Sequence, residues 1–76
     1  MMGTLNRNAD RLLIRICEYY NKTGKELVDP LEAGLGSEFD PFYTDLVVNG
    51  YITEPSVVSG EFRLLDRAIN FAKNLK

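Results

Sequence analysis

The side chains able to take part in chemistry are mostly carboxylates and basic groups, because the 76 residues include one cysteine and no histidine. A zinc site of the usual cysteine and histidine ligands is therefore excluded within one chain, and so is a Ser-His-Asp triad. The single thiol, Cys17, lies in an apolar stretch, where we expect it to be buried and inert. Gly34 and Gly36 are separated by Leu35 alone and no lysine follows them, so the sequence predicts no phosphate-binding loop.

The carboxylates have two interpretations, as an acid–base pair or as helix caps and solubilising charges. Asp29, Glu32, Glu38 and Asp40 all lie at expected helix starts, where the helix dipole favours negative charge. No polar pocket is implied around them. We therefore expect a protein that is not an enzyme and holds no cofactor and no metal.

A chain of this length makes one domain, over residues 1–76, with residues 1–4 as a flexible tail. Hydrophobic residues make up 45% and charged residues 26%, which is ordinary for a globular protein. No apolar stretch is long enough for a membrane span, and residues 1–9 have no signal-peptide core. We therefore expect a cytoplasmic protein with no membrane contact.

The first expected element is a helix over residues 5–20, which Thr23-Gly24 follows as a stop. Its apolar residues recur at about 100° per residue and predict one buried face: Leu5, Ala9, Leu12, Leu13, Ile16, Cys17 and Tyr20. Arg7, Arg11, Arg15 and Glu18 fall on the opposite face. Residues 25–28 follow as a short extended link.

Two helix starts come next. Asp29-Pro30-Leu31-Glu32 combines a capping aspartate, a proline suited to the first turn and a glutamate able to bond back to the cap. The glycines at 34 and 36 limit this helix to one or two turns. The next helix starts with either Ser37 or Asp40 as its cap, and the sequence leaves both open. It runs to Asn49, where Gly50 supplies a left-handed stop.

A β-hairpin and a last helix are expected after residue 50. Residues 51–53 and 62–65 have the composition of strands with turn-forming residues between them. Asp66 can cap a last helix from Arg67 to about Leu75. The predicted fold class is α+β, in the order helix, short helix, tight turn, helix, hairpin, helix.

This order resembles the winged helix-turn-helix superfamily. The resemblance is carried by the two stretches Leu46-Val47-Val48-Asn49-Gly50-Tyr51-Ile52 and Phe62-Arg63-Leu64-Leu65-Asp66-Arg67-Ala68-Ile69-Asn70-Phe71-Ala72. It covers roughly residues 5–75 as a pattern of residue types, and it departs at Ala68, where such proteins often have glycine. The resemblance implies a winged-helix fold that binds DNA through its third helix, while the hairpin, as a wing, contacts the DNA backbone.

The charge distribution opposes that function. Residues 23–54 carry one lysine against seven carboxylates, a net charge of −6, whereas residues 1–22 and 55–76 each carry +2. DNA binding needs positive charge where the phosphates lie, and the expected recognition helix has no arginine to pair with guanine. The remaining candidate DNA contacts are Arg11, Arg15, Thr44, Asn49, Arg63 and Arg67. A stripe of arginines is also typical of a solvated helix face.

The apolar residues outnumber what a small core holds. Ile14 and Tyr19 flank the buried face of the first helix, and Val57 and Val58 lie at the tip of the expected wing. We expect these four to contribute to an exposed apolar patch of the kind that marks a protein interface. The alternative is that they are ordinary, scattered surface residues.

The sequence therefore predicts a non-catalytic regulatory interaction module on a winged-helix scaffold, with a protein partner or self-association. The alternative is a DNA-binding transcription regulator that docks through the wing and the arginines of the first helix. The absence of basic residues from the third helix favours the first.

Overall fold

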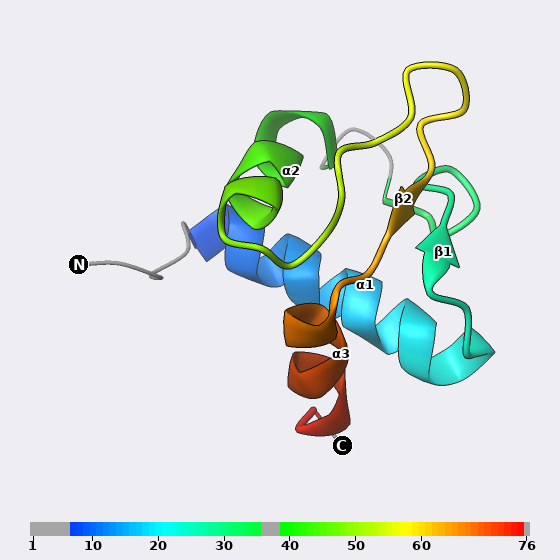
Figure 1. Cartoon of the computed structure of the whole chain (residues 1–76). Coiled ribbons are helices and arrows are strands. Elements are labelled where there is room, and N and C mark those ends of the chain that lie inside the picture. Colours follow the sequence, from blue (N-terminus) through cyan, green and yellow to red (C-terminus); the bar gives the residue numbers. More distant parts are fainter. Residues whose placement is uncertain (1–6, 36–38, 76) are drawn as a thin grey trace.

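Three helices and a two-stranded antiparallel sheet form the part of the chain described by the computed structural model, residues 7–35 and 39–75 (Figure 1). The elements are α1 (Arg7–Thr23), β1 (Leu27–Val28), α2 (Phe39–Val48), β2 (Phe62–Arg63) and α3 (Asp66–Lys73). This small α+β architecture agrees with the expected class. The predicted tail over residues 1–4 lies outside the described residues.

Helix α1 is the central element, and both α2 and α3 pack against it. The described residues of its predicted core face are buried: Ala9, Leu12, Leu13, Ile16 and Cys17 completely, and Tyr20 in part. The helix ends at Thr23, and Gly24 adopts the left-handed conformation (φ 76°) that a glycine stop allows. The predicted face and end are thus confirmed, with the helix three residues longer than expected at its C-terminal end.

The cysteine of α1 is buried, as expected. Cys17 has no exposed surface, and its Sγ lies 3.5 Å from the carbonyl oxygen of Ala68 on α3. Burial raises the pKa of this thiol to about 12. The small side chains Ala68 and Ala72 are also fully buried, so they let α3 approach α1 closely.

The predicted short helix at Asp29 is wrong, because residues 30–34 form hydrogen-bonded turns. The Asp29 side chain accepts a bond from the Leu31 amide, and the Ala33 amide bonds the Asp29 carbonyl. Gly34 then turns the chain at φ 72°, and Leu35 is buried directly after it. The first turn of a helix restricts several backbone dihedrals for only one hydrogen bond, so a segment this short does not continue as a helix.

Helix α2 begins at Phe39, so Asp40 lies inside the helix and is not its cap. The alternative cap, Ser37, lies outside the described residues. At the other end Gly50 has φ 78°, and its amide bonds the Val47 carbonyl. The predicted glycine stop is therefore confirmed, although the helix ends at Val48, one residue before the predicted end at Asn49.

The sheet is built differently from the predicted hairpin. Strand β2 pairs with β1, in the register Leu27 opposite Arg63 and Val28 opposite Phe62. Residues 51–53 lie beside the end of β2 through an isolated bridge, in which Ile52 is opposite Leu64 just after the strand, with flanking backbone bonds. The expected returning strand is thus present, but its strand partner is the segment predicted as an extended link.

Helix α3 begins at Asp66 with Leu65 in the capping position, and no side chain caps it. Asp66 is therefore the first helical residue, where its charge still suits the helix dipole. The core lies between the three helices and the sheet. Leu12, Ile16 and Leu46 are buried in it, and Phe71 packs against it in part.

Candidate functional site

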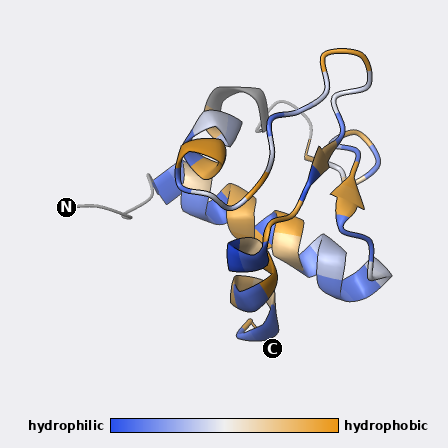
Figure 2. Ribbon diagram, viewed as in Figure 1, coloured by the Kyte–Doolittle hydropathy of each residue, from blue (hydrophilic) through white to orange (hydrophobic). Residues whose placement is uncertain are grey.

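The loop between Ile52 and β2 presents two valines to solvent. We refer to residues 54–61 as the tip loop; it projects from the sheet at the top of Figure 1. Val57 and Val58 have 102% and 92% of their reference surface exposed, and the tip of this loop has the hydrophobic colour in Figure 2. Such complete exposure of neighbouring β-branched side chains is unfavourable in water unless a partner covers them.

Hydrogen bonds hold the tip loop in shape. The Ser56 amide bonds the Glu61 carbonyl, and the Gly60 amide bonds the Ser56 carbonyl. The Ser56 hydroxyl also accepts bonds from the amides of Val58 and Ser59. The valines are therefore displayed by a loop with an internal bonding network.

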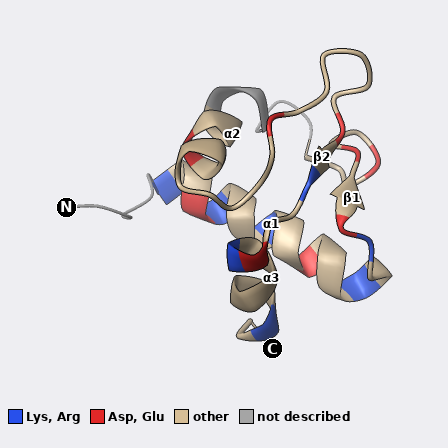
Figure 3. Ribbon diagram, viewed as in Figure 1, with Lys and Arg blue, Asp and Glu red and all other residues tan. Residues whose placement is uncertain are grey.

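The outer face of α2 is partly apolar, and the sequence of this helix contains no basic residue. Leu46 is buried, whereas Thr44 and Val48 lie on the opposite side of the helix and are exposed, Val48 by 77%. In Figure 3 the coloured part of this helix is acidic at Asp45 and carries no basic residue. Sequence reasoning missed Val48, although its position two residues after a core leucine already places it on the outer face.

Two of the arginines expected to contact DNA are bound within the chain. The Arg67 guanidinium lies 4.6 Å from the centre of the Tyr51 ring and donates a hydrogen bond to the Asn49 carbonyl. The Arg15 guanidinium donates to the Gly34 carbonyl at 2.8 Å. Each links two segments of the fold, so a phosphate would have to compete with an existing contact.

Asn49, another expected DNA contact, is similarly engaged. Its side-chain amide donates to the Asp45 carbonyl at 2.7 Å. Of the other candidates, Arg11 and Thr44 are exposed on separate helices. The structure thus distributes the proposed DNA contacts over several elements. It does not gather them into one surface, and α2 itself has no basic residue.

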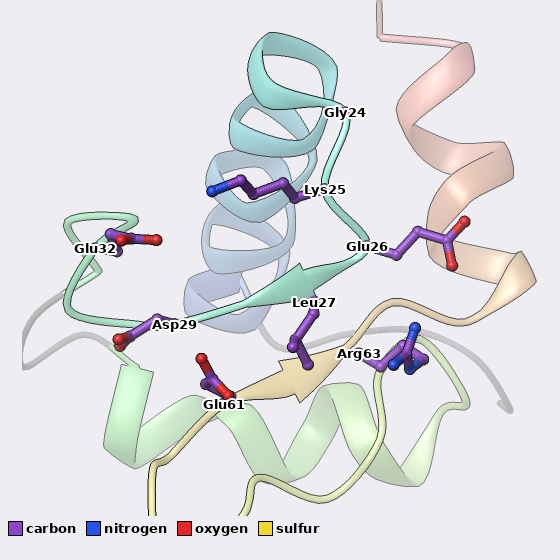
Figure 4. Close-up of a pocket in the computed structure, with 8 residues that line it drawn as sticks. All are labelled: Gly24, Lys25, Glu26, Leu27, Asp29, Glu32, Glu61 and Arg63. Atoms are coloured by element: carbon purple, nitrogen blue, oxygen red, sulfur yellow. The ribbon is translucent and has the colours of Figure 1, made fainter.

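Arg63 lies in an acidic hollow beside β1 and β2 (Figure 4). The side chains that line it carry four carboxylates and two bases: Lys25, Glu26, Asp29, Glu32, Glu61 and Arg63. Leu27, which is 45% exposed, also contributes to its wall. A phosphate that approached Arg63 would meet more negative than positive charge, which weakens the case for docking through this residue.

The two predicted interface residues of α1 are only half-buried, and they lie on a different element from the tip loop. Ile14 is on the outer side of the helix. The Tyr19 hydroxyl donates to Glu32 Oε1 at 3.3 Å. Loss of hydration, and then the charge of Glu32, raise the pKa of the Tyr19 phenol above its ordinary value. Tyr19 therefore fastens the turn at residues 30–34 to α1.

No candidate metal centre is found in residues 7–35 and 39–75. Within these ranges there is no group of three histidine, cysteine or carboxylate residues able to hold a metal. No helix of this region is both long and apolar enough to cross a membrane. Its buried side-chain polar atoms all have hydrogen-bond partners.

No protein-family model, curated protein or solved structure matches this chain significantly. The features that bear on function are therefore the exposed valines, the outer face of α2 without basic residues and the engaged arginines.

Proposed function

We propose that this chain is a non-catalytic interaction module that contacts protein through the tip loop and the outer face of α2. The observation that carries the proposal is the exposure of Val57 and Val58 on a hydrogen-bonded loop. Covering such side chains is favourable by about 25 cal/mol for each Å² of apolar surface removed from water. A loop already held in shape loses less conformational entropy when it binds.

The scaffold is, in this proposal, a winged helix. The tip loop takes the place of the wing and α2 that of the recognition helix, and the pairing of β1 with β2 gives the loop its base. A small binding module of this kind suits a regulatory role in the cytoplasm. The engaged Arg15 and Arg67, and an α2 without basic residues, support protein rather than DNA as the partner.

A DNA titration compares the two classes of partner directly. We expect binding to random duplex DNA at physiological salt to be weaker than about 10⁻⁴ M, the weak end of ordinary non-specific binding. Arg63→Ala and Arg67→Ala serve as controls. Micromolar binding that falls steeply with salt and is lost in both variants would contradict the proposal and favour a DNA-binding regulator.

Site-specific cross-linking tests the protein contact. A photoreactive amino acid replaces Val57 at the tip, and in a matched control it replaces Asn70, an exposed residue of α3. We expect a covalent protein adduct in cells from position 57 and none from position 70. Absence of any adduct from position 57 would contradict the proposal.

A further inference from the structure

We infer that the partner of the tip loop is a second copy of this chain, which receives Val57 and Val58 on the outer face of α1 around Ile14. This inference rests on the proposed function and names its partner. It draws on the complementary chemistry of two surfaces of the same chain.

The tip loop combines apolar and negative groups. Glu54 and Glu61 flank the exposed valines, and residues 54–61 include no basic side chain. Glu54 is exposed, and Glu61 accepts a bond from the Ser59 hydroxyl. The surface that fits this loop is therefore apolar at its centre and positive at its rim, because opposite potentials meet across specific interfaces.

The outer face of α1 has that composition. Arg7, Arg11 and Ile14 fall within about 60° around the helix axis at 100° per residue. Both arginines are exposed and Ile14 is half-buried, with part of its side chain accessible. Without Arg15, which is bound to the Gly34 carbonyl, residues 7–14 carry two arginines against Asp10, a net charge of +1 that is opposite in sign to the tip loop. Glu18, one turn further on, limits this positive region to the first part of the helix.

Other described surfaces fit the tip loop less well. The hollow beside the sheet has an excess of carboxylates, and α2 has no basic residue. On α3, Arg67 is already stacked on Tyr51. The arginine-rich part of α1 thus combines positive charge with accessible apolar surface.

The contact joins different surfaces, so each chain both offers a tip loop and receives one. Such a contact forms a closed ring or an open series of copies. A loop tip covers much less than the area of a permanent interface, so we expect weak, concentration-dependent association. The charged rim makes it weaker at high salt.

Charge reversal with mixing is the test. One variant carries Glu54→Lys and Glu61→Lys, and the other carries Arg7→Glu and Arg11→Glu. Sedimentation of each purified chain is followed between about 1 µM and about 1 mM, the range of weak contacts. A control, Lys25→Glu with Lys73→Glu, changes the net charge as much as the arginine variant does, at exposed residues outside both surfaces. Circular dichroism verifies that every variant is folded.

We expect each reversed variant to associate at least about tenfold more weakly than the original chain. An equimolar mixture of the two should associate about as strongly as the original, because every reversed surface then meets its complement. The control should keep most of the original association.

Three results would overturn the inference: an original chain that stays monomeric throughout, reversed variants that associate normally, or a mixture that fails to restore association. Loss of association in the control to the same degree would attribute the effect to net charge and overturn it too. If the original chain is monomeric while position 57 still cross-links another protein in cells, the proposed function stands and the self-contact does not.

Discussion

Replacing Leu46 by alanine tests whether the inner face of α2 contributes more to stability than its outer face does. Leu46 has no exposed surface and belongs to the core cluster. Truncating a buried leucine removes its transfer free energy and leaves a cavity, which together cost about 2–5 kcal/mol. Small domains have total stabilities towards the low end of about 5–15 kcal/mol, so the loss removes a large part of the reserve.

The measurement is urea unfolding followed by circular dichroism, with thermal unfolding as a second probe. For a domain of this size, we expect the melting temperature to fall by roughly 10–30 °C. The matched control is Val48→Ala on the same helix, because Val48 is 77% exposed. Its effect should stay within about 0.5 kcal/mol.

The two variants together test the assignment of faces. A Leu46→Ala variant that loses less than about 0.5 kcal/mol would place this residue outside the core. A Val48→Ala variant as damaging as Leu46→Ala would refute the exposed outer face of α2, and with it part of the proposed interaction surface.

Three further predictions concern single contacts. Arg67→Gln should lower the free energy of unfolding by at least about 0.5–1 kcal/mol, because it removes the stacking on Tyr51. Arg67→Lys should retain only part of that stabilisation. An unchanged urea midpoint in Arg67→Gln would show that the contact is not stabilising. Gly50→Ala should cost about 1–2 kcal/mol through backbone strain alone, since no atom beyond the two neighbouring residues lies within 4 Å of the added methyl position. Calorimetry measures this cost, and a neutral result would contradict the left-handed turn. The Cys17 thiol should resist alkylation until the chain unfolds, and rapid labelling of the native chain at pH 8 would refute its burial. Burial raises the pKa of this thiol from the ordinary 9.0 to about 12. The contribution of the buried thiol to the free energy of unfolding is therefore complete below pH 9 and is lost as the pH rises from 9 to about 12.

Periodicity made the first helix predictable. The apolar repeat through Leu12 and Ile16 identified the buried face of α1, and glycine stops identified its end and that of α2. These signals are local, because they depend on neighbours within one or two helical turns. The short helix at Asp29 failed for the opposite reason: its capping residues were recognised, but too few residues follow to propagate a helix.

The sheet needed information that no local pattern contains. Leu27 and Val28 have little of a strand signature, and their strand character comes from pairing with Phe62 and Arg63. The contacts of Arg67 could not be predicted from the sequence either, because its partners Tyr51 and Asn49 come from another part of the chain. The exposed tip at Val57 and Val58 was visible from the sequence, since turn-forming residues surround it.

The pairing of β1 with β2 also has a consequence for how the chain acquires its shape. The two strands are separated by residues 29–61, so neither has its partner until most of the chain has been synthesised. Closing so long a segment costs entropy before any strand bond is gained, and contacts distant in sequence slow folding. The hydrogen bonds of α1 are local and need no distant segment, whereas the edge of β1 stays unpaired until residues 62–63 are present. We therefore expect the sheet, and with it the base of the tip loop, to be the last part of this protein to form.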